Sequence, residues 1–177
     1  MTPSPCSVRP LTPGEAVENL AALCDLLVDA VEGGASVNFV MPISLEKAER
    51  FWRGLLASHA NGERILLVAE RGGRIEGTVQ VVLAPQENQF YRADIAKMLV
   101  HRRARRQGIG EALMRAAEEQ ARLHGRNLLT LDTQTGGAGE RLYARCGWTK
   151  FGEVPGFAIS TDGSVREAAS FFYKQAG

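Results

Sequence analysis

The sequence predicts a mixed α/β fold in which helices flank one largely antiparallel sheet. Apolar residues recur at helical spacing in four segments, and short apolar runs typical of strands occur in seven others. The expected order is a strand, two helices, three strands, a long helix, a strand, a short helix and two strands, so one central strand–helix–strand unit sits within a largely antiparallel sheet. This pattern favours an α+β or mixed α/β layer over a doubly wound Rossmann fold, which alternates strands and helices throughout.

The chain begins with an edge strand and two helices. Residues 1–10 are interpreted as a short lead followed by the edge strand. Apolar residues recur at helical spacing over residues 13–31, with a proline in the first turn and two glycines after the end. A second helix is expected to begin near Ser44, which is a candidate N-cap residue, and to run towards His59.

Strands and turns dominate the rest of the chain. Gly72 and Gly73 stand at the centre of a predicted tight hairpin. Gly125 is expected to end a strongly amphipathic helix over residues 108–124, and a shorter helix is expected over residues 139–146. The remaining strands are expected at residues 64–70, 75–84, 91–100, 128–133, 148–154 and 168–174, with a turn at 161–163.

The composition is that of one globular domain. The chain has 177 residues, enough to bury a hydrophobic core, so we expect a single domain over residues 1–177. The formal net charge of +1 does not favour binding to nucleic acid or to a membrane surface. No apolar run is long enough to span a bilayer, and residues 1–10 lack the apolar core of a signal peptide. The 3 cysteines, Cys6, Cys24 and Cys146, show neither metal-ligand spacing nor a disulfide pattern, so we expect no metal and a cytoplasmic protein.

A basic loop and two glycines lie between the predicted strand 91–100 and the predicted helix 108–124. Gly108 and Gly110 stand where the helix begins. The first N–H groups of a helix have no partner within it, and the helix dipole adds partial positive charge there. Glycine lets an anion approach the backbone closely. The stretch therefore indicates a diphosphate site, and a plain tight turn into a helix is the alternative on glycine spacing alone.

Other phosphate and nucleic-acid motifs fit this stretch less well. A Walker loop needs Lys and then Ser or Thr after its second glycine, but Glu111 and Ala112 follow Gly110. A dinucleotide fingerprint needs a third glycine where Leu113 stands, and it expects an earlier strand–helix–strand unit. The arginine-rich run 101–106 contains no interleaved aromatic residue, so it is interpreted as a solvated face or a partner for phosphates rather than a nucleic-acid site.

The loop carries a resemblance to a known family. The pattern Arg105-x-x-Gly108-x-Gly110 resembles the Arg/Gln-x-x-Gly-x-Gly/Ala motif with which N-acetyltransferases of the GNAT superfamily hold the diphosphate of coenzyme A. It stands after the family's fourth strand and at the start of its long central helix. The resemblance therefore implies that the anion bound here is acetyl-CoA, the cosubstrate of that family.

A second motif agrees with the first. Leu142-Tyr143-x-x-x-Gly147-Trp148 resembles the family's Leu-Tyr-x-x-x-Gly-Phe, with Trp148 in place of Phe. Further segments are similar to acetyltransferases of the tabtoxin-resistance type, which act on the amine of a β-lactam amino-acid toxin: residues 33–37, 131–133, 152–157 and 171–174.

The resemblance implies a fold, a donor and a class of acceptor. The sheet would have seven strands, and the strands 91–100 and 128–133 would splay apart to admit the pantetheine arm. The acceptor would be the amine of a small molecule, such as an amino-acid-like β-lactam toxin or antibiotic, and the protein would be a monomer or a homodimer. The residues implied to bind the coenzyme are Met98, Leu99, Val100, Arg105, Arg106, Gln107, Gly108, Ile109, Gly110 and Glu111.

Three side chains are the candidates for catalysis. Acetyl transfer needs a neutral amine, a stabilised oxyanion and a proton for the leaving thiolate. Asp94 and Asp132, on the two strands that splay, are candidates for removing the ammonium proton or for holding the cation, directly or through water. Backbone N–H groups near Leu99 and Val100 are the oxyanion candidates, and Tyr143 would protonate the thiolate.

Some positions depart from the family pattern, and some alternatives stay open. Gly136 stands where many members have an asparagine that contacts pantetheine, so backbone or water would take over that contact. Cys146 has no neighbouring partner that would make it a nucleophile, so direct transfer is expected. Residues 33–39 are candidates for lining the acceptor pocket. A protein or peptide N-acetyltransferase and a non-catalytic acyl-CoA-binding module are the alternative functions.

Overall fold

The computed structural model describes residues 6–176, so residues 1–5 of the expected lead and Gly177 lie outside the described range. Seven strands form one sheet in the order β1-β2-β3-β4-β5-β7-β6, and each neighbouring pair is antiparallel except β4 and β5. This is the mixed α/β architecture that the sequence predicts. The strands are β1 (Ser7–Pro10), β2 (Arg64–Arg71), β3 (Arg74–Leu83), β4 (Arg92–Val100), β5 (Leu128–Gln134), β6 (Thr149–Ile159) and β7 (Arg166–Gln175).

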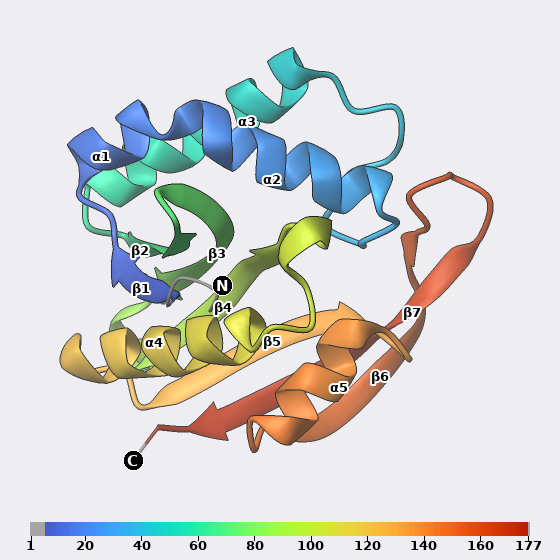
Figure 1. The fold of residues 1–177 in the computed structure, drawn as a ribbon. Helices are drawn as coiled ribbons and strands as arrows, with labels where there is room; N and C mark the ends of the chain where they lie inside the picture. Colours follow the sequence, from blue (N-terminus) through green and yellow to red (C-terminus); the bar gives the residue numbers. More distant parts are fainter. Residues whose placement is uncertain (1–5, 177) are drawn as a thin grey trace.

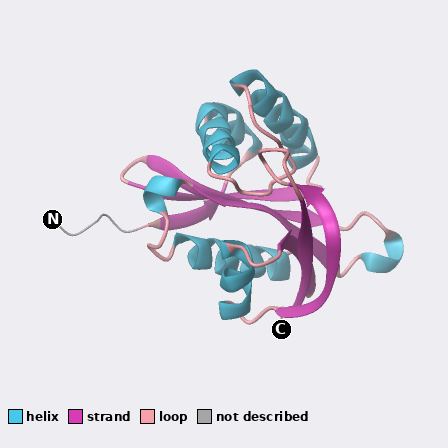
Figure 2. Ribbon diagram, turned by 90° about the vertical axis from the view of Figure 1, so that its right-hand side faces the viewer, coloured by secondary structure: helices cyan, strands magenta, loops and turns pink. Residues whose placement is uncertain are grey.

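Helices cover both faces of the sheet (Figure 1). Figure 2 shows the sheet seen nearly edge-on between the two helical layers. One layer contains α1 (Pro13–Glu18), α2 (Leu20–Glu32) and α3 (Leu45–Ala60), and the other contains α4 (Ile109–Leu123) and α5 (Ala138–Arg145). Short 3₁₀ turns, η1 (Glu87–Gln89) and η2 (Arg102–Ala104), flank β4. Among residues 6–176, no helix is long and apolar enough to cross a membrane.

The single helix expected over residues 13–31 is wrong, because the chain forms two helices that meet at Asn19. The Asn19 backbone has φ −96° and ψ 13°, outside the helical range. Its side-chain amide donates to the Glu15 carbonyl at 2.8 Å, where the backbone N–H of Asn19 also donates at 2.9 Å. An asparagine side chain that competes for backbone hydrogen bonds in this way interrupts a helix. The N-cap role expected of Ser44 is confirmed, since its side chain accepts from the Lys47 N–H at 3.1 Å.

The two strands at the end of the chain are longer than expected. β6 continues to Ile159 beyond the expected end at Val154, and β7 begins at Arg166 rather than at Ala168. The pairing of β6 with β7 shifts register between Val154 and Ala158. This bulge accommodates the proline and glycine of the segment within the ladder, which is why the strand does not stop there.

Strands β4 and β5 separate soon after they pair. Their parallel register covers three residue pairs, the last being Asp94 with Thr130. Beyond that pair β5 keeps its antiparallel partner β7 as far as Gln134, whereas β4 stays paired with β3 as far as Val100. The expected splay of these two strands is therefore present, and it opens the sheet in its middle.

A bulge in β4 lies beside this opening. The register with β3 pairs Thr78 with Leu99 and then Gln80 with Ala96, so two residues of β4, Lys97 and Met98, face one residue of β3. The backbone of Lys97 has φ +49°, in the left-handed region that residues other than glycine seldom adopt. A bulge leaves its extra residue unpaired and redirects the side chains around it.

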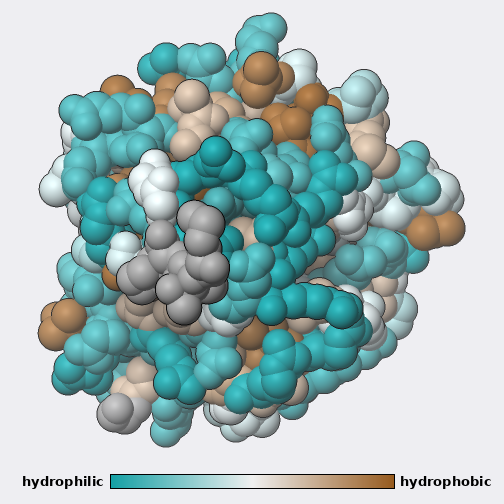
Figure 3. Space-filling view, viewed as in Figure 1, coloured by the Kyte–Doolittle hydropathy of each residue, from teal (hydrophilic) through white to brown (hydrophobic). Residues whose placement is uncertain are grey.

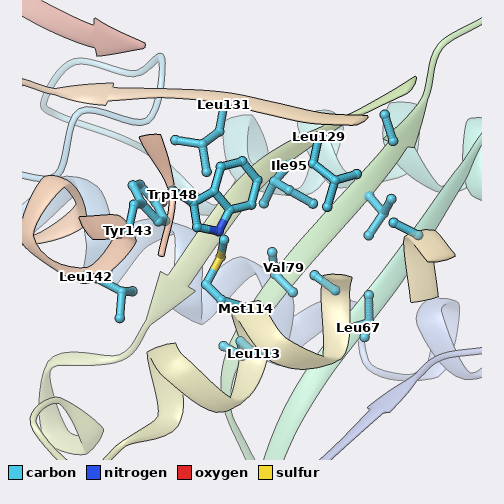
Figure 4. Packing of buried hydrophobic residues seen from close by; sticks show 14 of the residues in the cluster. Leu67, Val79, Ile95, Leu113, Met114, Leu129, Leu131, Leu142, Tyr143 and Trp148 are labelled. Atoms are coloured by element: carbon cyan, nitrogen blue, oxygen red, sulfur yellow. The ribbon is translucent and has the colours of Figure 1, made fainter. Parts of the chain in front are cut away.

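Each helical layer packs on the sheet through its own hydrophobic cluster. The cluster under α4 and α5 includes Leu113, Met114, Leu131, Tyr143 and Trp148, and Figure 4 shows these side chains in close packing. The cluster under α1, α2 and α3 surrounds a fully buried Trp52 on α3. Packing on both faces fixes the sheet on either side of the splay, so the opening is held by a rigid frame.

Candidate active site

A cavity of about 920 Å³ lies at the splay between β4 and β5. Its walls come from both helical layers. Residues 33–38, between α2 and α3, line it on one side of the sheet, and the N-terminus of α4 together with α5 lines it on the other. The open sheet edges contribute residues 95–100 of β4 and 132–134 of β5. The cavity therefore passes through the sheet, so that two reactants can enter from opposite faces and meet between the strands.

The N-terminus of α4 faces this cavity without a side-chain cap. Gly108 is the N-cap residue and adopts φ +79°, ψ −4°, and no side chain in the described part of the chain caps the helix. A Cβ atom built on Gly108 would have no heavy atom within 4 Å, which shows that the space in front of the helix is open. Arg106, two residues before Gly108, also has a positive φ of 59°. The loop thus presents the first backbone N–H groups of α4 to the cavity, as an anion site requires.

The arginine-rich run divides into two functions. Arg102 donates to Asp29 on α2 through its backbone N–H at 2.9 Å and its Nε at 2.8 Å. Arg103 donates to Glu76 through Nε at 2.7 Å, and both carboxylates are buried. Arg105 and Arg106, in contrast, line the cavity. The first two arginines therefore anchor the loop to the protein, while the last two are available to an anion.

The contacts that anchor the loop also change the pKa of the Asp29 carboxyl group. Burial by itself would raise the pKa of this carboxyl group, but the hydrogen bonds from Arg102 and the charge of His101 outweigh it and hold the pKa below its usual value. Asp29 therefore stays ionised and paired with the loop at neutral pH. The sequence offered no signal for this pairing, because 73 residues separate Asp29 from Arg102.

Most of the predicted coenzyme-binding residues line the cavity. Met98, Leu99 and Val100 line it from β4, and Arg105, Arg106, Gly108, Ile109, Gly110 and Glu111 line it from the loop and the first turn of α4. Gln107 is not among the lining residues. Its side chain is exposed, and its amide oxygen accepts a hydrogen bond from Arg71. Gly110 permits close packing of α4 on α5, because a Cβ there would lie 3.0 Å from Leu142 Cδ2.

Tyr143 reaches the cavity from α5. Its ring is buried against Phe172 and Trp148, with centroid separations of 6.0 and 6.3 Å. Burial raises the pKa of Tyr143 above its usual value, and the charge of Asp132 raises it further. The phenol is consequently protonated at neutral pH and can act as a proton donor to a group in the cavity.

Asp132 and Lys97 line the cavity from the two splayed strands. Asp132 lies beyond the last β4–β5 pair and is exposed. Lys97 is half-buried, and its Nζ lies 5.7 Å from the centroid of the Phe51 ring on α3. Burial lowers the pKa of Lys97, the charge of Asp132 opposes that change, and Arg64 adds to it. Sequence reasoning missed Lys97, although a lysine inside the otherwise apolar run 95–100 was a signal that could have identified it.

Asp94 is placed differently from Asp132. It does not line the cavity. Its carboxylate accepts from Arg92 at 2.6 Å and from the hydroxyl of Thr130, at the end of β4 that is still paired with β5. The structure thus brings Asp132 and Tyr143 to the cavity, and it holds Asp94 in a polar cluster beside it.

A family model matches the part of the chain that forms the loop and its surroundings. The family model described as an acetyltransferase (GNAT) domain matches residues 62–150, which include β4, the loop, α4 and α5. This chain belongs to the GNAT family of acetyltransferases. Over 118 residues it is 36% identical to a protein of Azospirillum brasilense described as an uncharacterized N-acetyltransferase in the hisH-hisA intergenic region, an alignment that covers 66% of this chain and 68% of that protein.

Solved structures share the whole GNAT fold. An N-acetyltransferase from Staphylococcus aureus Mu50 superposes with a TM-score of 0.80 at 16% identity, covering 98% of this chain and 100% of that one. The yncA protein of Salmonella typhimurium, solved with its cofactor acetyl-CoA, gives a TM-score of 0.77 at 18% identity, covering 97% of this chain and 94% of that one. At these identities the likeness concerns the fold.

Two positions at which this GNAT chain departs from the family motifs have local structural roles. Gly136 adopts φ +74° in the turn before α5, and its N–H donates to Glu140. Trp148, in place of phenylalanine, adds a hydrogen bond from its indole N–H to Glu118 at 2.8 Å. At the nearby Cys146, burial raises the pKa of the thiol, which disfavours the reactive thiolate.

Proposed function

We propose that this GNAT chain is an acetyl-CoA-dependent N-acetyltransferase that transfers the acetyl group directly to the amine of a small molecule. The observation that carries the proposal is the cavity through the splayed sheet, with the uncapped N-terminus of α4 on one side, Tyr143 and Asp132 in its walls, and residues 33–38 on the other side. We treat residues 1–177 as one catalytic domain. We place the protein in the cytoplasm, where free cysteines such as Cys24 and Cys146 persist.

The residues of the loop fit the diphosphate of the donor. The N–H groups at the start of α4 and the side chains of Arg105 and Arg106 provide hydrogen bonds and positive charge at the cavity wall. The edge of β4 that faces β5 has no parallel partner after Asp94, so its backbone groups can bind the pantetheine amides as an added strand would. The acetyl-CoA complex of the yncA protein, which has the same fold, supports this assignment.

The side chains around the splay can carry the proton transfers. Asp132 accepts a proton from the acceptor ammonium, directly or through water, which frees the nitrogen lone pair for attack on the acetyl carbon. As the C–N bond forms and the C–S bond breaks, the Tyr143 phenol gives its proton to the leaving sulfur. The acylated nitrogen loses its second proton to water, which leaves a neutral amide, and water restores the proton of the phenol. The unpaired backbone of the bulge at Lys97 and Met98, next to the N–H groups of Leu99 and Val100, stabilises the negative charge that develops on the acetyl oxygen. Asp94 is the second candidate for the base, acting through water from its cluster with Arg92.

The acceptor class follows from the wall opposite α4. Residues 33–38 line the cavity on the side where the acceptor enters, and a cavity walled by this loop favours a small molecule over a peptide. The resemblance of residues 33–37 and 152–157 to acetyltransferases of the tabtoxin-resistance type favours an amino-acid-like β-lactam toxin among small amines. Resistance to such a toxin is the biological role that we propose.

The test is an acceptor screen with the full chain. Release of free thiol from acetyl-CoA is measured with amino acids, β-lactam toxins, polyamines and peptides, and coenzyme binding is measured separately by calorimetry. Acetylation of small amines in preference to peptides would support the proposal. A preference for peptides would contradict the acceptor class, and coenzyme binding without turnover on any amine would indicate a non-catalytic module.

A further inference from the structure

Lys97 is a cation that lacks an ion pair in the wall of the cavity. Within residues 6–176, no carboxylate lies within 4.0 Å of its ammonium group. The side chain is half-buried and lies over the Phe51 ring. A half-buried ammonium is costly unless an anion approaches it, so this position favours an anionic partner.

The direction of the Lys97 side chain places it on the acceptor side of the sheet. Leu131 packs in the cluster under α4, so Asp132, the next residue of β5, points to the opposite face. Lys97 contacts Phe51 of α3, which belongs to the same opposite face. Lys97 and Asp132 therefore share the side of the sheet that carries residues 33–38. Tyr143 and the diphosphate loop lie on the other side.

The charges around Lys97 compensate its charge only at a distance. Asp132 is the acidic group whose charge acts on Lys97, and Arg64 is a second cation that acts on it. Arg64 donates to the neutral side chains of Gln80 at 2.7 Å and Ser58 at 2.9 Å. The charge of Glu63 acts on Arg64, but no carboxylate within residues 6–176 forms an ion pair with it. Because Coulomb interactions are stronger in a partly desolvated site than in water, one additional negative charge would be stabilised beside Lys97.

We propose that Lys97 binds a carboxylate of the acceptor while Asp132 faces its amine, so that the acceptor is an amino-carboxylate. This inference rests on the proposed function and extends it to a specificity-determining residue. A zwitterionic acceptor carries an ammonium group and a carboxylate. On the same face of the sheet, Asp132 of β5 offers a negative charge to the first and Lys97 of β4 offers a positive charge to the second. An amine without a carboxylate, such as a polyamine, would leave the positive charge of Lys97 without an anionic partner.

The experiment compares matched acceptors on matched variants. Each of the common L-amino acids, β-alanine and γ-aminobutyrate is assayed beside its carboxamide, with wild type, Lys97→Met and Lys97→Arg. Lys47→Met is the control variant, because Lys47 is also a lysine over an aromatic ring, Phe39 at 5.5 Å, but lies outside the cavity at the splay. Coenzyme affinity and Tm are measured for every variant.

Wild type is expected to favour carboxylates over the matched amides. Lys97→Met should raise KM for the best carboxylate acceptor by about 10- to 100-fold, the usual range for a lost charge-assisted hydrogen bond, and should leave KM for the amide unchanged. Lys97→Arg should retain most of the discrimination, and Lys47→Met should retain all of it. Coenzyme affinity should be the same in all four proteins.

Four outcomes would overturn the assignment. If wild type acetylated each acid and its carboxamide equally well, Lys97 would not bind a carboxylate of the acceptor. If Lys97→Met lowered kcat equally for both acceptors, Lys97 would act as a base rather than as a specificity residue. Acetylation of polyamines or peptides alone would assign another acceptor class. Coenzyme binding without acetylation of any compound in either series would also refute the amino-carboxylate, whereas a failure of acetyl-CoA to bind would refute the proposed function itself.

Discussion

Arg92 and Asp94, two residues apart on β4, form an ion pair with an N–O distance of 2.6 Å at the point where β4 still pairs with β5. Thr130, the cross-strand partner of Asp94, donates its hydroxyl to the same carboxylate. The pair lies just before the strands separate, whereas Asp132 lies just after. Two carboxylates that are equivalent in the sequence pattern thus differ in their access to the cavity, and this difference can be measured.

We expect Asp132→Asn to lower kcat by about 10²- to 10⁴-fold, the usual contribution of a general base. Asp94→Asn should leave kcat closer to wild type and lower the Tm, because it weakens the ion pair with Arg92 and the hydrogen bond from Thr130 that ties β4 to β5. Steady-state kinetics and thermal unfolding of the two variants check this prediction. The reverse order of the two kcat values would make Asp94 the base.

Tyr143→Phe is expected to lower kcat by about 10²-fold with little change in the Kd of coenzyme A, because the ring packing is kept and only the proton donor is lost. Kinetics and calorimetry with the same preparation measure both quantities. Equal losses in kcat and in coenzyme affinity would argue that the hydroxyl serves binding rather than proton transfer.

The pH profile offers an independent measurement on Tyr143. Burial disfavours the phenolate, and the charge of Asp132 adds to this effect, so the pKa lies above the ordinary 10.0. A raised pKa keeps the phenol protonated to higher pH. We therefore expect that kcat does not fall near pH 10 through deprotonation of Tyr143. A falling limb near pH 10 that disappears in Tyr143→Phe would contradict this assignment.

Gly108→Val is expected to abolish coenzyme binding while the fold persists. The residue has φ +79°, and a side chain there would occupy the open space in front of α4. The matched control is Gly125→Val, at the other end of α4, where φ is +70° and a Cβ also meets no atom within 4 Å. Both variants should lose stability by about 1–2 kcal/mol from left-handed backbone strain.

Coenzyme affinity separates the two glycine variants. Only Gly108→Val should lose it, because Gly125 lies at the C-terminal end of the helix. Calorimetric titration with coenzyme A measures the difference. Normal affinity in Gly108→Val, or an equal loss in both variants, would refute the diphosphate site.

Glu140 should stabilise the fold in a pH-dependent way. Hydrogen bonds from Lys150, from the Gly136 N–H and from Ser170 lower its pKa from 4.5 to about 2. Because the pKa is lower in the folded state, this stabilisation is complete above pH 4.5 and is lost as the pH falls towards about 2. Glu140→Gln should therefore lower the Tm at neutral pH and have little effect at about pH 2.

The control for Glu140→Gln is Glu119→Gln. Glu119 also pairs with a basic residue, Arg122, but on an exposed helix face where such pairs contribute little. Thermal unfolding at the two pH values compares the variants. A Tm deficit of Glu140→Gln that stays constant down to about pH 2 would show that the side chain acts through packing rather than through its charge.

Much of the fold was predictable because its signals are local. The hairpin glycines, Gly72 and Gly73, both have positive φ, and Gly125 ends α4 with φ +70°. Ser44 caps α3 as its residue type and position suggested. The break at Asn19 was missed because an asparagine within a helical pattern is compatible with either a continuous or an interrupted helix, and the hydrogen bond to Glu15 decides between them.

The site was predictable only in part, for a related reason. The sequence by itself determined that α4 begins at a glycine, whose side chain cannot cap the helix, and that α5 carries a tyrosine. Each of these is a property of one short segment and its backbone. The tertiary structure decided that Arg102 and Arg103 anchor the loop, that Asp94 is paired, and that Lys97 points to the acceptor side. Those outcomes depend on strand register, on one bulge and on partners far away in the chain, and a shift of one residue reverses which face a strand side chain occupies.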